Sequence, residues 1–374
     1  MDILTMNDHG LSLHKSYTRQ IKQLNFYFLL IASNLFCRPK QTSVYYFALT
    51  KIPTFLCLAL LTPFGIVGNA GVIYVYGFRL KKTNLQHFIT LLAVFDIVCC
   101  LVAFPLKMVE LWLPVMYPSG LLCKVQNSII CFTCVASALT LLIISVDRYK
   151  KVCRPTQSQM TLMHAKILFL VITIVSLAFA VTAALVYDRR NLSLTDGGDL
   201  VGHICVMDFN SVITQGYFLA LFVVLVTVLG TMLVLYCLVW RAAKKHFKQS
   251  DLRYRHNDNQ EEGDDHQSPH KKNLHRTNRT VVLISLLFAV SFVPSLMVSV
   301  LFAQFTHVKF SMATRTVREL IYGTWALNSS MNPLVYGFCN ENFRMEFQSL
   351  RIPFGCYGRY TTPKKDNIQP IAQV

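Results

Sequence analysis

A single carboxylate lies in the middle of a long apolar stretch, where the surroundings normally exclude a charge. Asp96 interrupts the run Leu85–Leu106, and its neighbours in that run are uncharged. An ionisable residue inside a membrane span is costly and is therefore a functional-site hypothesis. The small polar residues of other apolar runs that we group with it are Asn69, Ser137, Asn328, Ser329 and Asn332. Such oxygen ligands predict a site for a hard monovalent cation, or a carboxyl that takes up a proton on burial.

The sequence contains no pattern that predicts covalent chemistry. A hydrolase would need a nucleophile with a base, and a metalloenzyme would need a ligand cluster such as His-Glu-x-x-His; we find neither, and most of the 11 histidines lie in termini and loops. We therefore expect a protein that is not an enzyme. A seven-helix transporter is the alternative from a different class, although the paired, broken segments of an internal repeat are not visible.

Seven apolar runs must position these polar residues. A bilayer core of about 30 Å needs roughly 20 helical residues, and polar backbone in lipid is satisfied only by helices or closed barrels. With 53% apolar and 15% charged residues, the chain does not resemble two soluble domains. The runs are Ile52–Phe78, Leu85–Leu106, Val125–Val146, Ile167–Tyr187, Phe209–Trp240, Thr280–Val308 and Leu320–Asn340. They predict an all-α membrane protein, a seven-transmembrane helix bundle.

The positions of the charges explain the formal net charge of +17. Segments 79–84 and 149–166 are basic and lack acids, whereas 113–122 is uncharged and 188–208 contains more acids than bases. Basic residues favour the cytoplasmic side of a membrane. We therefore expect an extracellular N-terminus, a cytoplasmic C-terminus and no nucleic-acid partner.

The predicted organisation has three parts. Residues 1–51 form an extracellular segment, in which the stretch 24–36 is short enough for a signal sequence, although a loosely structured tail is the preferred interpretation. Residues 52–340 form the bundle, with a third cytoplasmic loop that we expect to be disordered at about 249–270. Residues 341–374 form a short amphipathic eighth helix and a tail, in which Cys356 is a palmitoylation candidate.

Several motifs in order resemble those of rhodopsin-like (class A) G-protein-coupled receptors, and the resemblance covers roughly residues 52–350. Asp147-Arg148-Tyr149 ends the third run, and Asn332-Pro333-Leu334-Val335-Tyr336 ends the seventh. Gly68-Asn69 lies in the first run and Leu92-Ala93-Val94-Phe95-Asp96 in the second. The resemblance implies a plasma-membrane receptor that switches a heterotrimeric G protein, with arrestin as a further cytoplasmic partner and membrane lipid around it.

The same resemblance implies roles for individual residues. Cys123 and Cys205 would form the outer disulfide, and Asp96, Ser137, Asn328 and Asn332 would form a pocket for an allosteric sodium ion, with Asp96 as the charged metal ligand; no other cofactor is required. The G-protein switch would comprise Asp147, Arg148, Tyr149, Tyr236, Asn332, Pro333 and Tyr336. The toggle would comprise Phe288, Phe292 and Pro294, with Phe292 where the family usually has tryptophan.

The outer ends of the spans favour a peptide ligand, as in neuropeptide receptors. Ile130 occupies the position where amine receptors carry an aspartate, and the run Leu320–Asn340 lacks the lysine that an opsin needs. The expected ligand mouth comprises Lys107, Glu110, Asn127, Ile130, Gln304, Arg318 and Tyr322. Several donors and acceptors beside apolar anchors suit a peptide, and a small lipid or metabolite is the alternative. Asn191, in Asn-Leu-Ser, is a glycosylation acceptor on the outer side.

Overall fold

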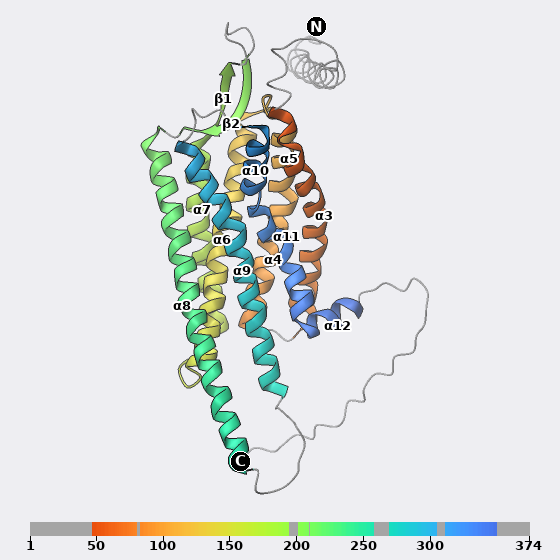
Figure 1. The fold of residues 1–374 in the computed structure, drawn as a ribbon, viewed down its shortest axis with the longest axis vertical. Helices are drawn as coiled ribbons and strands as arrows, with labels where there is room; N and C mark the ends of the chain where they lie inside the picture. Colours follow the sequence, from red (N-terminus) through yellow and green to blue (C-terminus); the bar gives the residue numbers. More distant parts are fainter. Residues whose placement is uncertain are drawn as a thin grey trace, which may run out of the picture.

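The protein is a bundle of long helices that lie side by side (Figure 1). The structure, a computed structural model, describes residues 47–80, 83–193, 201–208, 210–257, 269–304 and 311–349. Its elements are α3 (Ile52–Tyr74), η1 (Val75–Arg79), α4 (Asn84–Val98), η2 (Cys99–Ala103), α5 (Phe104–Trp112), α6 (Gly120–Cys153), α7 (Leu162–Val186), β1 (Tyr187–Ser193), β2 (Val201–Met207), α8 (Val212–Asn257), α9 (Pro269–Gln304), α10 (Met312–Tyr322), α11 (Trp325–Cys339) and α12 (Glu341–Ser349).

The predicted seven-helix bundle is confirmed. Among the described residues, six helices are long and apolar enough to cross a membrane. The seventh span is α10 followed by α11, which a turn at Gly323 and Thr324 divides. We call the end of the bundle that carries β1 and β2 the hairpin end, and the opposite end the α12 end (Figure 1).

Polar residues at the span boundaries fix where the helices begin. Thr83 and Gln86 form a capping box at the start of α4, and Thr161 and His164 form one at the start of α7. Each box satisfies backbone N–H groups that the first helical turn leaves without partners. Ser119 caps α6 through its hydroxyl in the same way. These caps place the helix starts next to the apolar runs.

A wide turn changes the second span where the sequence predicts one regular helix. The π-helical segment η2 lies between α4 and α5, and Pro105 occupies the first turn of α5. Proline has no N–H, and its ring crowds the carbonyl of the preceding turn, so a π turn accommodates it. The extra residue in the turn rotates the face that α5 presents. As a result Lys107 is buried inside the bundle, with only 8% of its surface exposed.

Two paired strands, β1 and β2, lie where the sequence predicts only a connecting loop. Strand β1 pairs antiparallel with β2, from Tyr187 opposite Met207 to Ser193 opposite Val201. The Cys123–Cys205 disulfide, with its Cα atoms 5.5 Å apart, joins β2 to the first turn of α6 and confirms the predicted bond. The hairpin is therefore fixed to the bundle at its second strand.

Helices α8 and α9 extend beyond the apolar runs of the fifth and sixth spans. Helix α8 continues to Asn257 and projects beyond the other helices at the α12 end, while α9 begins at Pro269 (Figure 1). Residues 249–257 are thus helical rather than disordered, since the glutamine, leucine and two arginines of this stretch are good helix formers that continue an existing helix at little cost. The rest of the predicted loop up to residue 268, the signal-like stretch 24–36 and Cys356 lie outside the described residues.

Small residues allow α3 to approach α11 closely. A Cβ atom added to Gly68 would lie 2.7 Å from Cγ of Pro333 and 2.8 Å from its Cβ. Nearby, the Asn69 amide donates to the backbone oxygen of Gly65 at 2.9 Å and to that of Ser329 at 2.8 Å. Glycine at position 68 therefore lets the polar side of α3 reach the backbone of the seventh span.

The close approach predicts that Gly68→Ala destabilises the bundle by about 1–3 kcal/mol, the usual cost of overpacking a rigid contact. Gly230→Ala on α8 is the matched control, because a Cβ there meets nothing within 4 Å and alanine is the better helix former. The apparent melting temperature of the purified protein should fall for Gly68→Ala and stay equal or rise for Gly230→Ala. Equal melting temperatures for the two variants would contradict this packing.

Candidate functional site

A cavity opens between the helices near the hairpin end. It encloses roughly 980 Å³ including its open mouth, which lies within the size range of binding pockets for small ligands. Five spans and β1 contribute side chains to its wall. Of the residues expected at the ligand mouth, four line this cavity: Lys107, Asn127, Ile130 and Tyr322. The structure therefore brings four of the seven predicted mouth residues to one space.

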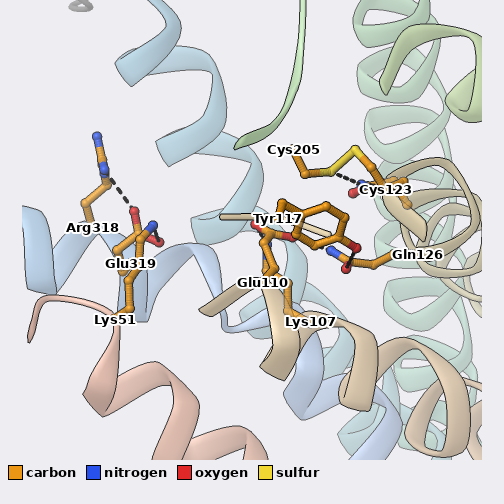
Figure 2. Close-up of polar contacts among 10 residues, drawn as sticks. Lys51, Lys107, Glu110, Tyr117, Cys123, Gln126, Cys205, Arg318 and Glu319 are labelled. Atoms are coloured by element: carbon orange, nitrogen blue, oxygen red, sulfur yellow. Dashed lines mark hydrogen bonds and ion pairs between the residues drawn. A yellow bond between two sulfur atoms is a disulfide. The ribbon is translucent and has the colours of Figure 1, made fainter. Parts of the chain in front are cut away.

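A chain of polar contacts extends from the cavity wall into the protein (Figure 2). The Lys107 ammonium lies 2.6 Å from Oε1 of Glu110 and 5.2 Å from the centre of the Tyr322 ring. The second oxygen of Glu110 accepts a hydrogen bond from the Gln126 amide. Gln126 in turn accepts one from the Tyr117 hydroxyl at 2.9 Å. Both oxygens of Glu110 are thus bonded. Glu110 contacts Lys107 but is not itself among the residues that line the cavity.

Strand β2, which we call the roof of the cavity, is anchored to three parts of the chain: β1, residues 115–117 and α6. The backbone N–H of His203 in β2 donates to the oxygen of Val115 at 2.7 Å, and the N–H of Tyr117 donates back to His203 at 2.8 Å. Strand β2 therefore has a partner on both edges, β1 on one side and residues 115–117 on the other. Asn127 lies beneath it and donates to the backbone oxygen of Cys123 at 2.9 Å.

The floor of the cavity contains the aromatic residues of the predicted toggle. Phe288 and Phe292 line the cavity, and their ring centres are 4.7 Å apart. Trp325, at the start of α11, lines it as well. Pro294 lies within α9, one helical turn or less from Phe292. Proline removes a backbone hydrogen bond and kinks a helix. The floor of the cavity therefore lies next to the point where the sixth span bends most easily.

Two side-chain hydrogen bonds join this kink to the turn that divides the seventh span. The Ser295 hydroxyl donates to the backbone oxygen of Tyr322 at 2.9 Å, and the Thr324 hydroxyl lies 2.8 Å from the backbone oxygen of Ser291. We call these two contacts the span 6–7 latch. Because the turn at Gly323 interrupts the helix, carbonyl groups there need partners outside their own span. The latch supplies one and ties together two irregular backbone segments.

The predicted cation site lies deeper in the bundle. Asp96 is fully buried, and one of its oxygens accepts a hydrogen bond from the Asn332 amide at 2.8 Å. Within the described part of the chain, several other buried oxygens have no hydrogen-bond partner: Asp96 Oδ1, Ser137 Oγ, Asn69 Oδ1, Asn328 Oδ1 and Asn332 Oδ1. Buried polar atoms are nearly always satisfied. These oxygens are therefore free to coordinate a cation or to accept hydrogen bonds from ordered water.

The predicted switch residues lie toward the α12 end. The Arg148 guanidinium donates to Oδ2 of Asp147 at 2.7 Å, and the Lys151 ammonium lies 2.9 Å from the same oxygen. Asp147 and Arg148 are both buried, so their attraction is screened little by water. Tyr149, next in the chain, accepts a hydrogen bond from Arg154 at 3.3 Å on the protein surface. Arg148 is therefore held by its immediate neighbour.

The two switch tyrosines are placed differently. The Tyr236 hydroxyl lies 2.7 Å from Oγ of Ser145 and 2.6 Å from Oγ of Ser285, which joins α8 to α6 and α9. Tyr336, which follows Pro333 in α11, is buried, and its ring centre lies 5.5 Å from that of Tyr76. Its hydroxyl has no hydrogen-bond partner among the described residues.

Of the remaining predicted residues, Arg318 and Asn191 are not among those that line the cavity. Arg318 pairs with Glu319 at 2.8 Å, and Glu319 also pairs with Lys51 at 2.7 Å, which ties α10 to the start of the first span (Figure 2). Asn191 is exposed on β1, with its Oδ1 2.9 Å from Nδ1 of His203. Nothing is described of the Gln304 side chain, although its backbone ends α9.

Sequence reasoning missed several hydroxyl-bearing residues that line the cavity. They are Tyr187, Tyr217, Ser295 and Ser299. Tyr187 ends an apolar run, so its position in the sequence indicates the boundary of a span rather than a side chain facing inward. Ser295, which directly follows Pro294, and Ser299 are four residues apart, so their common helix face is a signal that the sequence does contain. Tyr217 gives no such signal.

Comparison with known proteins gives a consistent result. The sequence model of the family described as "7 transmembrane receptor (rhodopsin family)" matches residues 68–336. The C3a anaphylatoxin chemotactic receptor of Danio rerio is 24% identical over 80% of this chain and 74% of its own length. The type-1 angiotensin II receptor A of Rattus norvegicus is 27% identical over 76% of this chain and 77% of its own. The C5a anaphylatoxin chemotactic receptor 1 of Danio rerio is 34% identical over a shorter part, 37% of this chain and 41% of its own.

The span 6–7 latch predicts that Thr324→Val destabilises the protein by about 0.5–1.5 kcal/mol, the usual net value of one hydrogen bond. Valine keeps the shape of threonine but leaves the Ser291 carbonyl without this donor. Thr324→Ser should retain stability. Thr182→Val is the control, because that exposed hydroxyl bonds only to its own helix, at the backbone oxygen of Ala178. Melting temperatures of the purified variants check this, and a Thr324→Val protein as stable as the wild type would show that the latch contributes nothing.

Proposed function

Since the chain belongs to the rhodopsin family of seven-transmembrane receptors, we propose that it is a plasma-membrane receptor that binds an extracellular peptide and activates a heterotrimeric G protein. The protein is a multi-pass membrane protein and a receptor rather than an enzyme. The observation that carries the proposal is the cavity at the hairpin end, whose floor is formed by Phe288 and Phe292 next to the Pro294 kink. A ligand there contacts the part of the sixth span that is easiest to bend.

The peptide assignment rests on the relatives and on the character of the cavity wall. The relatives named above are receptors for C3a, for angiotensin II and for C5a, all of them peptide-binding. Lys107, Tyr187, Ser295 and Tyr322 place polar groups among apolar residues in the wall. A peptide needs such a mixture, because its backbone amides require partners while its side chains bury apolar area.

The charge distribution supports an extracellular hairpin end. Arg79 and the basic residues of segment 149–166 lie at the α12 end, and basic residues favour the cytoplasm. The N-terminus, which precedes the first span, is then extracellular. Asn191 lies exposed on the hairpin, where a glycan can be attached in this orientation.

The switch follows from the contacts at the α12 end. In the resting arrangement Asp147 holds Arg148, and Tyr236 is bonded between Ser145 and Ser285. Outward movement of α9 separates Ser285 from Tyr236 and frees its hydroxyl to meet Arg148. An agonist shifts this equilibrium only by its higher affinity for the open state. The surface exposed between α6, α8 and α9 then receives the G protein, and arrestin competes for the same cytoplasmic end.

A sodium ion fits the Asp96 site. Asp96 supplies the charge, and the unpaired oxygens of Ser137, Asn328 and Asn332 supply neutral ligands of the kind that hard cations prefer. A cation bound there compensates the buried carboxylate and holds α4, α6 and α11 together. It therefore favours the resting arrangement.

Sodium should stabilise the purified receptor, and Asp96→Asn should abolish the effect. A cation at ten times its dissociation constant stabilises the folded state by about 1.4 kcal/mol, which raises the melting temperature by a few degrees. The measurement compares sodium chloride with choline chloride at equal ionic strength. Ser176→Ala, which removes a buried hydroxyl on α7 outside this site, serves as control and should keep the sodium response. A wild-type protein indifferent to sodium would count against the site.

The functional test is a peptide-library screen in cells that express the receptor with promiscuous G proteins, with intracellular calcium as the readout. We expect active peptides, and we expect Phe292→Ala to weaken them at least tenfold, since the half-buried Phe292 ring lines the cavity and its loss removes apolar contact with the ligand worth about 1.4 kcal/mol or more. Trp112→Ala, on the outer surface of α5 and 51% exposed, should leave them unchanged. Responses to lipids but to no peptide would overturn the ligand assignment while leaving the receptor assignment intact.

A further inference from the structure

The cavity presents one formal charge to its occupant. Among the described residues that line it, Lys107 alone is charged at neutral pH, and the others are apolar, hydroxyl, thiol or amide side chains. An ammonium group loses most of its hydration when it is buried, so it must be compensated by neighbouring groups. The way in which Lys107 is compensated indicates what else it can bind.

Among the described residues, one carboxylate and one aromatic ring lie next to the Lys107 ammonium and compensate its charge. Glu110 binds Lys107 at 2.6 Å, and the Tyr322 ring lies 5.2 Å away. A lysine ammonium has three N–H donors, and the carboxylate contact uses one of them. Both oxygens of Glu110 already have a donor, Lys107 on one and Gln126 on the other, and Glu110 is not among the residues that line the cavity (Figure 2). The group available to the cavity is therefore the cation, and the anion behind it holds it in place.

We propose that Lys107 is the anchor for a carboxylate of the ligand, so that the receptor selects acidic over neutral or basic ligands. This inference rests on the proposed function only for the identity of the ligand as a peptide. A carboxylate beside Lys107 accepts the remaining N–H donors in a site of low dielectric, where charge-assisted hydrogen bonds are strong. Phe288, Phe292 and Trp325 line the same cavity and supply apolar contacts to the residue that carries the carboxylate.

The carboxylate can belong to a peptide C-terminus or to an acidic side chain, and two probes separate these sources. N-acetyl-phenylalanine has a terminal carboxylate beside an aromatic ring, and N-acetyl-glutamate α-amide has a side-chain carboxylate. Each is compared with its neutral analogue, N-acetyl-phenylalaninamide or N-acetyl-glutamine α-amide. Thermal unfolding of the purified full-length receptor over a range of probe concentrations gives the apparent affinity without any signalling step.

We expect at least one acid to bind the wild type tenfold or more tightly than its amide. The double variant Lys107→Gln/Glu110→Gln removes the charge without leaving Glu110 unpaired, and it should lose this preference. Lys107→Arg should retain it. If neither acid binds better than its amide to the wild type, the proposal is overturned, even if the double variant fails to fold. An acid preference that persists in the double variant overturns it as well.

The calcium screen keeps this test separate from that of the proposed function. Absence of any peptide response in cells, together with an acid preference that depends on Lys107, would contradict the peptide assignment alone. Peptide responses from both free-acid and amidated libraries, together with equal binding of acids and amides, would contradict the carboxylate anchor alone.

Discussion

Polar groups in the middle of a bilayer have no water to bind, and every other feature of this protein depends on that constraint. Helices satisfy the backbone within each span, but the side chains of Asp96, Asn69 and Asn332 also bond to groups from other spans. Their contacts therefore run between α3, α4 and α11. Gly68 provides the close approach that these contacts need. The deep polar cluster thus joins α3, α4 and α11, and the cavity lies apart from it, near the hairpin end.

Two irregular backbone segments, the part of α9 around Pro294 and the turn at Gly323, lie beside the cavity. Irregular segments in a membrane need partners from neighbouring helices, and here the Pro294 kink and the turn at Gly323 bind each other through Ser295 and Thr324. Tyr322 connects this latch to Lys107, since its ring faces the ammonium and its backbone oxygen accepts from Ser295. A ligand that rearranges the surroundings of Lys107 therefore acts on the kink through a single intervening residue. This contiguous path gives the proposed switch a physical basis.

The sequence predicts the parts that the bilayer dictates and fails where tertiary contacts decide. Charge-free runs located the spans, because the cost of a charge in lipid does not depend on the neighbouring helices. Cys123 and Cys205 followed from the resemblance to the family and are joined. The π turn before Pro105, the division of the seventh span and the β1–β2 pairing depend on partners distant in the sequence, and local patterns do not reveal them. Arg318 illustrates the limit: its position suggested the ligand mouth, whereas its described ion pair is with Glu319, which also binds Lys51.

The construction of the roof governs how a ligand enters and leaves. Strand β2 is bonded along both edges and is covalently attached to α6 through Cys205. Such a roof cannot fold aside without breaking several hydrogen bonds at once, so the entrance keeps a nearly constant width. An extended chain with a narrow end can thread beneath it, whereas a folded domain can insert only a terminus or a protruding loop.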